Sequence, residues 1–509
     1  MSLASMLRSL VGHSDVRRAR DGEGLRAAAL HADVYAELAR FEAALGGLPG
    51  DGIVLGRATN VQGTPFWVRM LERDFFATHH WITGASGSGK SFLVIALLIC
   101  ILSRQRPNPL IILDFKSELT TLLMDTVLPA LVARPSGERL LANLRIVRPF
   151  GEHLPMLNLT LPEPGVPREI QAMSIANAIA EALGTDFGHR MNRALLRLVT
   201  LAIELEEPLT VVRAWLEDPS VFARAATRST DLSLRTYAAT LRARENRASI
   251  DALLARLDAF LFMPATRRVL SASGCLSFAD ALESGVTIVG LGDPPAGVES
   301  QTRFWGGALL GKLMRSILSR PVGPDSPYAL VVFEEFQEGV ASRQTAWERL
   351  LAMARHKKIS CVYVNQQPGQ LDPGLVKLLR TNCGVEAAFR ANVDDARAYA
   401  HAVALPAGSR KTGEARQALV EQLTRLERRQ YLLWVKEKAR AQLVRSPRLE
   451  LERLQARADA LPAAVREQIA RGTVSMEAND GTQHAPPAAA APPVHEFLQP
   501  RHDDDFNLG

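Results

Sequence analysis

The sequence predicts an α/β fold in which helices cover both faces of a largely parallel sheet and an all-helical domain is inserted. Three observations support this prediction. Short apolar runs recur along the chain and alternate with helical stretches, as in sheets that are buried on both faces. A glycine-rich loop lies between one such run and an apolar helix. Between about residues 165 and 280 the strand signal stops, while the apolar residues keep helical spacing.

The predicted parts follow one another along the chain. An Ala- and Leu-rich helical segment comes first and a charged helix follows the α/β domain, whereas the last residues, rich in Pro and Ala with an acidic tip, are expected to be disordered. The predicted parts are the N-terminal helical segment (1–48), the α/β domain (49–160 and 281–447), the all-α insertion (161–280), the charged helix (448–473) and the tail (474–509).

The strands of the α/β domain are predicted from short apolar runs that end in turn or polar residues. A β-rich lead-in covers residues 52–70. The further runs are "HHWIT", "PLIILDF", "LRIVRPF", "GVTIVGLG", "YALVVFEEF", "ISCVYVNQQ", "CGVEAAFRA" and the closing stretch "QYLLWVKEKARAQLVRSP".

Composition bounds the class of protein. The 509 residues are 47% hydrophobic and 22% charged, which is typical of globular chains. A net charge of +6 permits contact with nucleic acid or an anionic membrane without requiring it. The four cysteines have no metal-ligand spacing, which favours buried free thiols in a reducing compartment.

The first 15 residues carry arginine and lack a continuous apolar core, so they do not resemble a secretory signal. The longest apolar run, residues 92–102, is too short to span a bilayer. We therefore expect a cytoplasmic chain without direct membrane insertion.

Residues 84–91, "GASGSGKS", fit the phosphate-loop pattern G-x-x-x-x-G-K-[ST]. Its glycines allow positive φ angles, so that backbone N–H groups can surround a phosphate. Lys90 can reach the β- and γ-phosphates, and the Ser91 hydroxyl can bind Mg²⁺. An ordinary Gly/Ser turn is the alternative, but the strand before the loop and the helix after it favour nucleotide binding. The predicted binding residues are Gly84, Ala85, Ser86, Gly87, Ser88, Gly89, Lys90 and Ser91.

An acidic pair follows the buried run at residues 329–333. Glu334 is expected to hold Mg²⁺, usually through water, and Glu335 to orient or deprotonate the attacking water. The usual first residue of such a pair is Asp, so Glu334 departs by one methylene. Two exposed glutamates at the start of a helix are the alternative interpretation.

Two further strand ends carry polar residues. Gln366 could hydrogen-bond the γ-phosphate or the water, with Gln367 as its competitor and an exposed turn glutamine as the alternative. Asp114 and Lys116, with Glu118 nearby, end the strand that we expect next to the phosphate loop. They could contact Mg²⁺, water or a neighbouring subunit, or form a surface charge cluster.

Together these motifs resemble those of the HerA–FtsK superfamily of ring-forming motor ATPases, and most of all the type IV coupling proteins of conjugation and type IV secretion. The resemblance covers roughly residues 50–447 and implies a RecA-like ATPase domain. The D-x-K-x-E-L, acidic-pair-Phe and Q-x-x-x-Q-L patterns of that family are matched by Asp114, Lys116, Glu118, Leu119, Glu334, Glu335, Phe336, Gln366, Gln370 and Leu371.

The resemblance implies an ATP-driven DNA translocase that requires Mg²⁺, forms a hexameric ring and contacts the phosphate backbone of DNA, independently of sequence. ATP would lie between subunits, with an arginine from the neighbour completing the site; Arg390 is the first candidate and Arg380 the second. Secretion-channel, relaxase or nuclease proteins are the implied partners. Coupling proteins usually begin with membrane-spanning helices, which this sequence lacks, so an inner-membrane position would need a partner.

Two other functions stay open at this point. One is a protein-export motor of a secretion system, which modest basicity and the lack of a recognisable DNA-reading module allow. The other is a HerA-like translocase that works with a separate nuclease in repair or phage defence.

Overall fold

The structure is a computed structural model. The predicted N-terminal segment (1–48) and nearly all of the predicted tail lie outside the residues that it describes. The described residues are 52–60, 63–104, 107–133, 137–184, 188–292, 299–340, 344–403, 412–438, 440–449 and 451–476.

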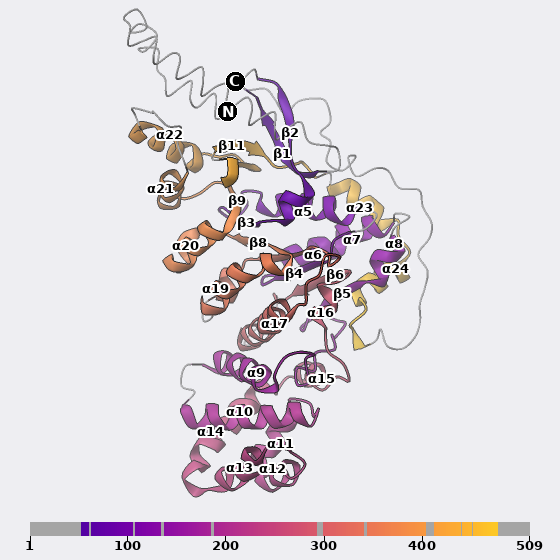
Figure 1. The fold of residues 1–509 in the computed structure, drawn as a ribbon. Helices are drawn as coiled ribbons and strands as arrows, with labels where there is room; N and C mark the ends of the chain where they lie inside the picture. Colours follow the sequence, from indigo (N-terminus) through magenta and orange to yellow (C-terminus); the bar gives the residue numbers. More distant parts are fainter. Residues whose placement is uncertain are drawn as a thin grey trace, which may run out of the picture.

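The described strands form one eleven-stranded sheet in the order β2-β1-β11-β10-β9-β3-β8-β7-β4-β6-β5 (Figure 1). Its larger part, from β9 to β5, is parallel. The parallel strands are β9 (Cys383–Ala388), β3 (His79–Thr83), β8 (Ile359–Asn365), β7 (Ala329–Glu334), β4 (Leu110–Asp114), β6 (Val286–Gly290) and β5 (Leu144–Val147).

Four antiparallel strands extend the sheet beyond β9. The predicted lead-in supplies two of them and the predicted closing stretch the other two, and these distant segments pair with each other through Arg57 and Arg445. The strands are β1 (Ile53–Thr59), β2 (Pro65–Met70), β10 (Gln430–Val435) and β11 (Arg440–Arg445). The predicted α/β class with a mostly parallel sheet is therefore confirmed.

Both faces of the sheet are buried, which explains why its central strands read as continuous apolar runs. Ile111 and Leu113 of β4 face one hydrophobic core, whereas Leu110 and Ile112 face the other. The first core includes helices α17 (Glu299–Ser319), α19 (Gln344–Met353) and α20 (Pro373–Asn382). The second includes α5 (Lys90–Leu102), α7 (Leu128–Val132), α23 (Leu451–Asp459) and α24 (Ala463–Arg471).

Between β5 and β6 the described residues form helices and no named strand. These helices gather beyond one edge of the sheet in Figure 1, and α9 packs against α17. They are α9 (Arg168–Leu183), α10 (His189–Glu204), α11 (Val211–Glu217), α12 (Pro219–Ala226), α13 (Leu232–Arg242), α14 (Arg247–Phe260), α15 (Pro264–Leu270) and α16 (Phe278–Ala281). The boundaries of the all-α domain stay a prediction.

The remaining helices connect strands or extend other helices. They are α4 (Glu72–Phe76), α6 (Glu118–Leu122), α8 (Gly137–Ala142), α18 (Gln337–Val340), α21 (Val393–Ala402) and α22 (Thr412–Thr424), with a π-helical turn at Leu123–Val127 and 3₁₀ turns at Arg244–Asn246, Arg355–Lys357, Pro368–Gln370 and Lys436–Lys438. None of the described helices is both long enough and apolar enough to cross a bilayer.

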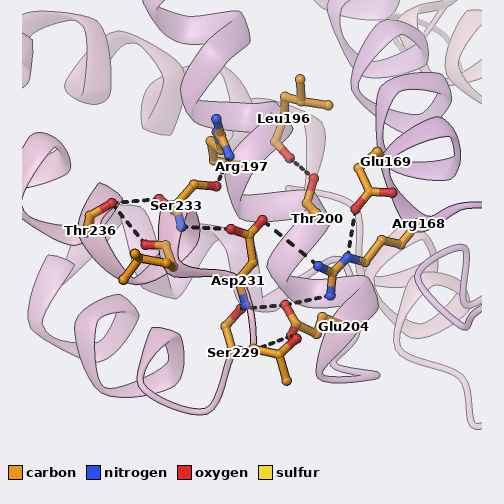
Figure 2. A network of polar contacts seen from close by, with 12 residues as sticks. Arg168, Glu169, Leu196, Arg197, Thr200, Glu204, Ser229, Asp231, Ser233 and Thr236 are labelled. Carbon is orange, nitrogen blue, oxygen red and sulfur yellow. Dashed lines mark hydrogen bonds and ion pairs between the residues drawn. The ribbon is translucent and has the colours of Figure 1, made fainter.

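A polar network joins three of the inserted helices (Figure 2). Arg168, the first residue of α9, pairs with Glu204 at the end of α10 at 3.0 Å and with Asp231 at 4.0 Å. Glu204 also accepts hydrogen bonds from Ser229 Oγ and from the backbone N–H of Thr230. Since Asp231 caps α13, the network fixes how α9, α10 and α13 meet.

The sequence-based picture is wrong in two places. The strand that ends at Asp114, β4, does not lie next to the phosphate-loop strand β3, because β8 and β7 lie between them. The charged C-terminal helix (448–473) is divided into α23 and α24. Pro462, which lacks an N–H group, stands at the start of α24 and separates the two.

A buried ion cluster attaches the inserted helices to the sheet domain. Glu163, just before α9, accepts hydrogen bonds from Lys312 (3.1 Å) and Arg315 (2.6 and 2.8 Å) of α17. Burial alone would raise the pKa of Glu163, but the Arg315 hydrogen bond and the two cationic charges outweigh it and lower that pKa. All three side chains are nearly buried, so the Glu163 carboxylate and the two cations must offset each other's loss of hydration through their ion pairs.

We predict that Glu163→Ala lowers the free energy of unfolding by about 3–5 kcal/mol, because it leaves two cations buried without their carboxylate. Arg397→Ala is the matched control, since it removes a solvent-exposed ion pair with Asp394, and its effect should stay within about 0.5 kcal/mol. Urea denaturation measures both. Equal stability losses would show that the cluster does not hold these elements together.

Candidate active site

The candidate site lies where four neighbouring parallel strands end. β3, β8, β7 and β4 are adjacent in the sheet and run in the same direction. Their carboxyl ends therefore meet at one edge, which is where open α/β sheets bind ligands. The phosphate loop, Gln366, the acidic pair and Asp114 follow these four strands in that order.

The phosphate loop takes the backbone shape that its glycines allow. Gly84, Gly87 and Gly89 have φ angles of 151°, 71° and 106°. A Cβ atom at Gly84 would lie 2.4 Å from Phe389 Cβ, and one at Gly89 would lie 2.9 Å from the backbone nitrogen of Arg429. Residues with side chains are thus excluded at two positions by contact as well as by conformation.

Neighbouring strands hold the loop at both sides. The N–H of Gly84 donates to the carbonyl of Gln366 (3.0 Å), and the N–H of Ala85 donates to the carbonyl of Arg390 (2.8 Å). The carbonyl of Ser88 accepts a hydrogen bond from the N–H of Arg429 (2.7 Å). The loop is therefore built into the sheet edge before any ligand binds.

The Lys90 ammonium is buried and directed into the loop. Its Nζ donates to the carbonyl of Gly84 at 2.7 Å and to that of Ala85 at 3.3 Å. Burial lowers the pKa of Lys90, while the charges of Glu335 and Glu334 oppose this effect. A cation that has only carbonyl partners in a buried loop is suited to bind an anion such as a phosphate.

Glu334 is a buried carboxyl group beside the phosphate loop. Burial, followed by the charges of Asp114 and Glu335, raises its pKa to about 8. Among the described residues its Oε2 has no hydrogen-bond partner. An oxygen-rich cation such as Mg²⁺ fits this unpaired atom, with the Ser91 hydroxyl one residue after Lys90 as a second oxygen ligand. The described residues hold no group of three or more His, Cys, Asp or Glu that could bind a metal by themselves, so water and phosphate would complete the coordination.

Glu335 has a strained backbone and a well-anchored side chain. Its φ is 54°, in the left-handed region that residues with side chains rarely adopt. The carboxylate accepts hydrogen bonds from Lys116 Nζ at 2.9 Å and from Gln366 Nε2 at 3.2 Å, and one from Gln337. Strained residues that surrounding contacts hold in place concentrate at functional sites.

The structure distinguishes Gln366 from Gln367. The amide of Gln366 reaches Glu335, whereas the side-chain oxygen of Gln367 accepts a hydrogen bond from Asn392 at 3.2 Å. Of the two candidates, only Gln366 therefore contacts the acidic pair.

Asp114 is placed differently from the expectation. Its two carboxylate oxygens accept hydrogen bonds from the backbone N–H groups of Lys116 (3.1 Å), Ser117 (2.9 Å) and Thr120 (2.7 Å). Burial raises its pKa even though these bonds oppose the shift. Asp114 therefore fixes the turn that leads into α6, and Lys116 is the residue of that motif that reaches the acidic pair.

The two arginine candidates also differ in placement. The guanidinium of Arg380 lies 5.9 Å from the ring centre of Trp81 and 5.2 Å from that of Tyr399, inside its own chain. Arg380 is thus a packing residue rather than a group extended toward a neighbour. Arg390 is exposed, but its backbone carbonyl accepts a hydrogen bond from Ala85 of its own phosphate loop, whereas an arginine donated to a neighbouring subunit should face away from that loop.

Sequence reasoning missed four residues that support the site. Trp81 Nε1 donates to Asn365 Oδ1 (2.9 Å), and the hydroxyl groups of Thr83 and Tyr399 are 2.7 Å apart. These contacts join β3, just before the phosphate loop, to β8 and α21. The polar residue at the end of the run "ISCVYVN" was the available signal for Asn365, whereas nothing local indicates Tyr399.

Solved structures share this fold. The unbound bacterial conjugative coupling protein TrwBdeltaN70 matches with a TM-score of 0.50 and 16% identity, over 76% of this chain and 87% of its own. VirB4 of Thermoanaerobacter pseudethanolicus matches with a TM-score of 0.54 and 14% identity, over 80% of this chain and 99% of its own. The plasmid coupling protein TrwB in complex with ADP and Mg²⁺ has a TM-score of 0.48 at 14% identity, over 74% and 86%.

No family model matches the chain, and no curated protein matches it either. The similarity to TrwBdeltaN70 and VirB4 shows that this chain shares their fold, as the resemblance of the motifs led us to expect.

We predict that Asp114→Asn costs about 1–3 kcal/mol of folding stability, because an amide nitrogen replaces one acceptor and leaves a buried backbone N–H unpaired. Thermal unfolding measures the loss, with Asp372→Asn as a control at an exposed helix cap. A stable Asp114→Asn chain that binds no nucleotide would contradict the anchoring role.

Proposed function

We propose that the chain is a Mg²⁺-dependent ATPase that uses the edge of β3, β8, β7 and β4 as its active site. One observation carries the proposal: the acidic pair lies next to the phosphate loop. Glu335 follows the buried Glu334, contacts Gln366, and interacts electrostatically with Lys90. An acidic pair next to a phosphate-loop lysine is the arrangement that phosphoryl transfer requires.

The residues divide the chemistry among them. The loop N–H groups and Lys90 would bind the β- and γ-phosphates of ATP. Ser91 and Glu334 would hold Mg²⁺, which neutralises charge on these phosphates. Glu335 would orient and deprotonate the attacking water, and Gln366, which touches the carboxylate of Glu335, would hold that water or the γ-phosphate.

We further propose that hydrolysis drives translocation of DNA, in a ring whose size the resemblance puts at six subunits. The fold shared with a conjugative coupling protein and the net charge of +6 support this reading. In such a ring, the exposed side chain of Arg390 would have to extend away from its own phosphate loop to stabilise the γ-phosphate of the next subunit, a role that suits a guanidinium because it is always charged and planar. A partner would recruit the chain from the cytoplasm to the inner membrane.

We predict that Lys90→Ala abolishes ATP turnover while the fold persists, because the loop is anchored by backbone hydrogen bonds that the substitution leaves intact.

Glu335→Gln should bind ATP and stall, with turnover lower by about 10²-fold or more, since the base is lost and the phosphate contacts remain. Phosphate release, nucleotide binding and circular dichroism check these outcomes. Normal turnover in a folded Lys90→Ala chain would refute the assignment.

We also predict that DNA stimulates hydrolysis and that DNA binding weakens steeply with salt, because contacts to phosphates release counterions. Titrating single-stranded and duplex DNA at about 50 and 200 mM salt measures both effects. If no DNA binds even at low salt, the chain is a motor for another cargo, and the protein-export alternative takes precedence.

A further inference from the structure

The ammonium group of Lys116 bridges two loops at the candidate active site. Lys116 follows β4, and its Nζ donates to Glu335 Oε2 at 2.9 Å. A second carboxylate, that of Glu338, lies 3.9 Å from the same nitrogen and is more than half exposed. Gln366 contacts Glu335 from the strand on the other side of β7. The carboxylate of Glu335 is therefore held from both neighbouring strands.

The backbone on both sides of this ion pair is rigidly held in unusual conformations. Ser117 and Glu335, one on each loop, have φ angles of 61° and 54°. Such conformations are unfavourable for residues with side chains and persist only where neighbouring contacts impose them. Asp114 provides these contacts for the first loop, and the hydrogen bond from the N–H of Phe336 to the carbonyl of Val364 provides one for the second.

The loop after β6 supports the same arrangement. The N–H of Gly292 donates to Ser117 Oγ at 2.8 Å. A Cβ at Gly292 would lie 2.2 Å from the carbonyl oxygen of Lys116, so the two backbones are in direct contact. The turn that carries Lys116 is thus held by hydrogen bonds to the Asp114 carboxylate and by the contact with Gly292, which follows β6. In this turn the Lys116 side chain lies next to Glu335.

The charges are matched for this role. Partial burial lowers the pKa of Lys116, but Glu335, Glu338 and Glu118 together outweigh it and raise that pKa, so the ammonium stays charged. Glu335 carries the carboxylate that the proposed mechanism uses as its base. A fixed cation beside a carboxylate restricts it to one orientation.

We propose that Lys116 is a positioning residue for ATP hydrolysis, which acts through Glu335 by holding the carboxylate in the orientation that the attacking water requires. This inference rests on the proposed ATPase function. Lys116 acts on the chemical step through Glu335, to which its ammonium donates a hydrogen bond. Its loss therefore affects kcat and leaves KM nearly unchanged.

The test is steady-state ATP hydrolysis by the full chain and its variants. Lys116→Met keeps the length of the side chain and removes the charge, and should lower kcat about tenfold or more with KM for ATP within about twofold. Lys116→Arg should recover most of the kcat. Glu338→Gln is the matched control, since it removes the exposed carboxylate near the same ammonium, and it should leave both constants unchanged.

A double-mutant cycle separates positioning from structural support. In the Glu335→Gln background, Lys116→Met should cause no further loss, because the carboxylate on which it acts is gone. An additive loss would overturn the inference, as would an unchanged or raised kcat in Lys116→Met, or a large rise in KM, which would show nucleotide contact. An inactive wild-type chain would refute the proposed function itself, whereas an active wild type with an unaffected Lys116→Met refutes only this inference.

Discussion

The parallel pairing of β3, β8, β7 and β4 is the constraint on which the candidate site depends. In this register Thr83 pairs with Asn365, Glu334 with Val364, and Asp114 with Glu334. Since successive strand ends are one strand spacing apart, about 5 Å, four separate stretches of sequence deliver their polar residues to one place. Shifting any of these strands by one residue would turn its polar end to the opposite face of the sheet.

This edge of the sheet brings the ammonium groups of two lysines close to the carboxyl groups of the acidic pair. The charges of Glu334 and Glu335 act on Lys90, but the hydrogen bonds of Lys90 go to loop carbonyls. Lys116 donates to Glu335. Among the described residues, the buried Lys90 ammonium thus has no hydrogen-bonded anion, and Oε2 of the buried Glu334 has no hydrogen-bond partner. A phosphate with its metal ion satisfies both groups at once, because it brings negative charge to the loop and positive charge to the carboxylate.

Much of this arrangement follows from local sequence, and the rest depends on distant contacts. The phosphate loop and the apolar runs are local patterns, so the strands and the α/β class were predictable. The insertion of β7 and β8 between β3 and β4 was not, because parallel pairing joins segments far apart in the chain. The sequence also left Gln367 as a competitor of Gln366, and the turn after β8 directs Gln366 toward Glu335.

The contacts made by individual charged residues were likewise beyond sequence reasoning. A charged residue at a strand end is visible, but its partner is not. Asp114 turned out to bond three backbone N–H groups, and Arg380 to lie against the rings of Trp81 and Tyr399. Both placements depend on residues that only the folded chain brings together.

The central claim is that the buried carboxyl group of Glu334 binds Mg²⁺ next to the phosphate loop. Calorimetry of Mg²⁺·ATP binding at about pH 7, in two buffers with different ionisation enthalpies, tests it most directly. With a pKa of about 8, Glu334 is mostly protonated before binding and must lose its proton to hold the metal. We expect the wild type to release close to one proton more than Glu334→Gln. Equal proton release by the two chains, or no binding by the wild type, would contradict the account.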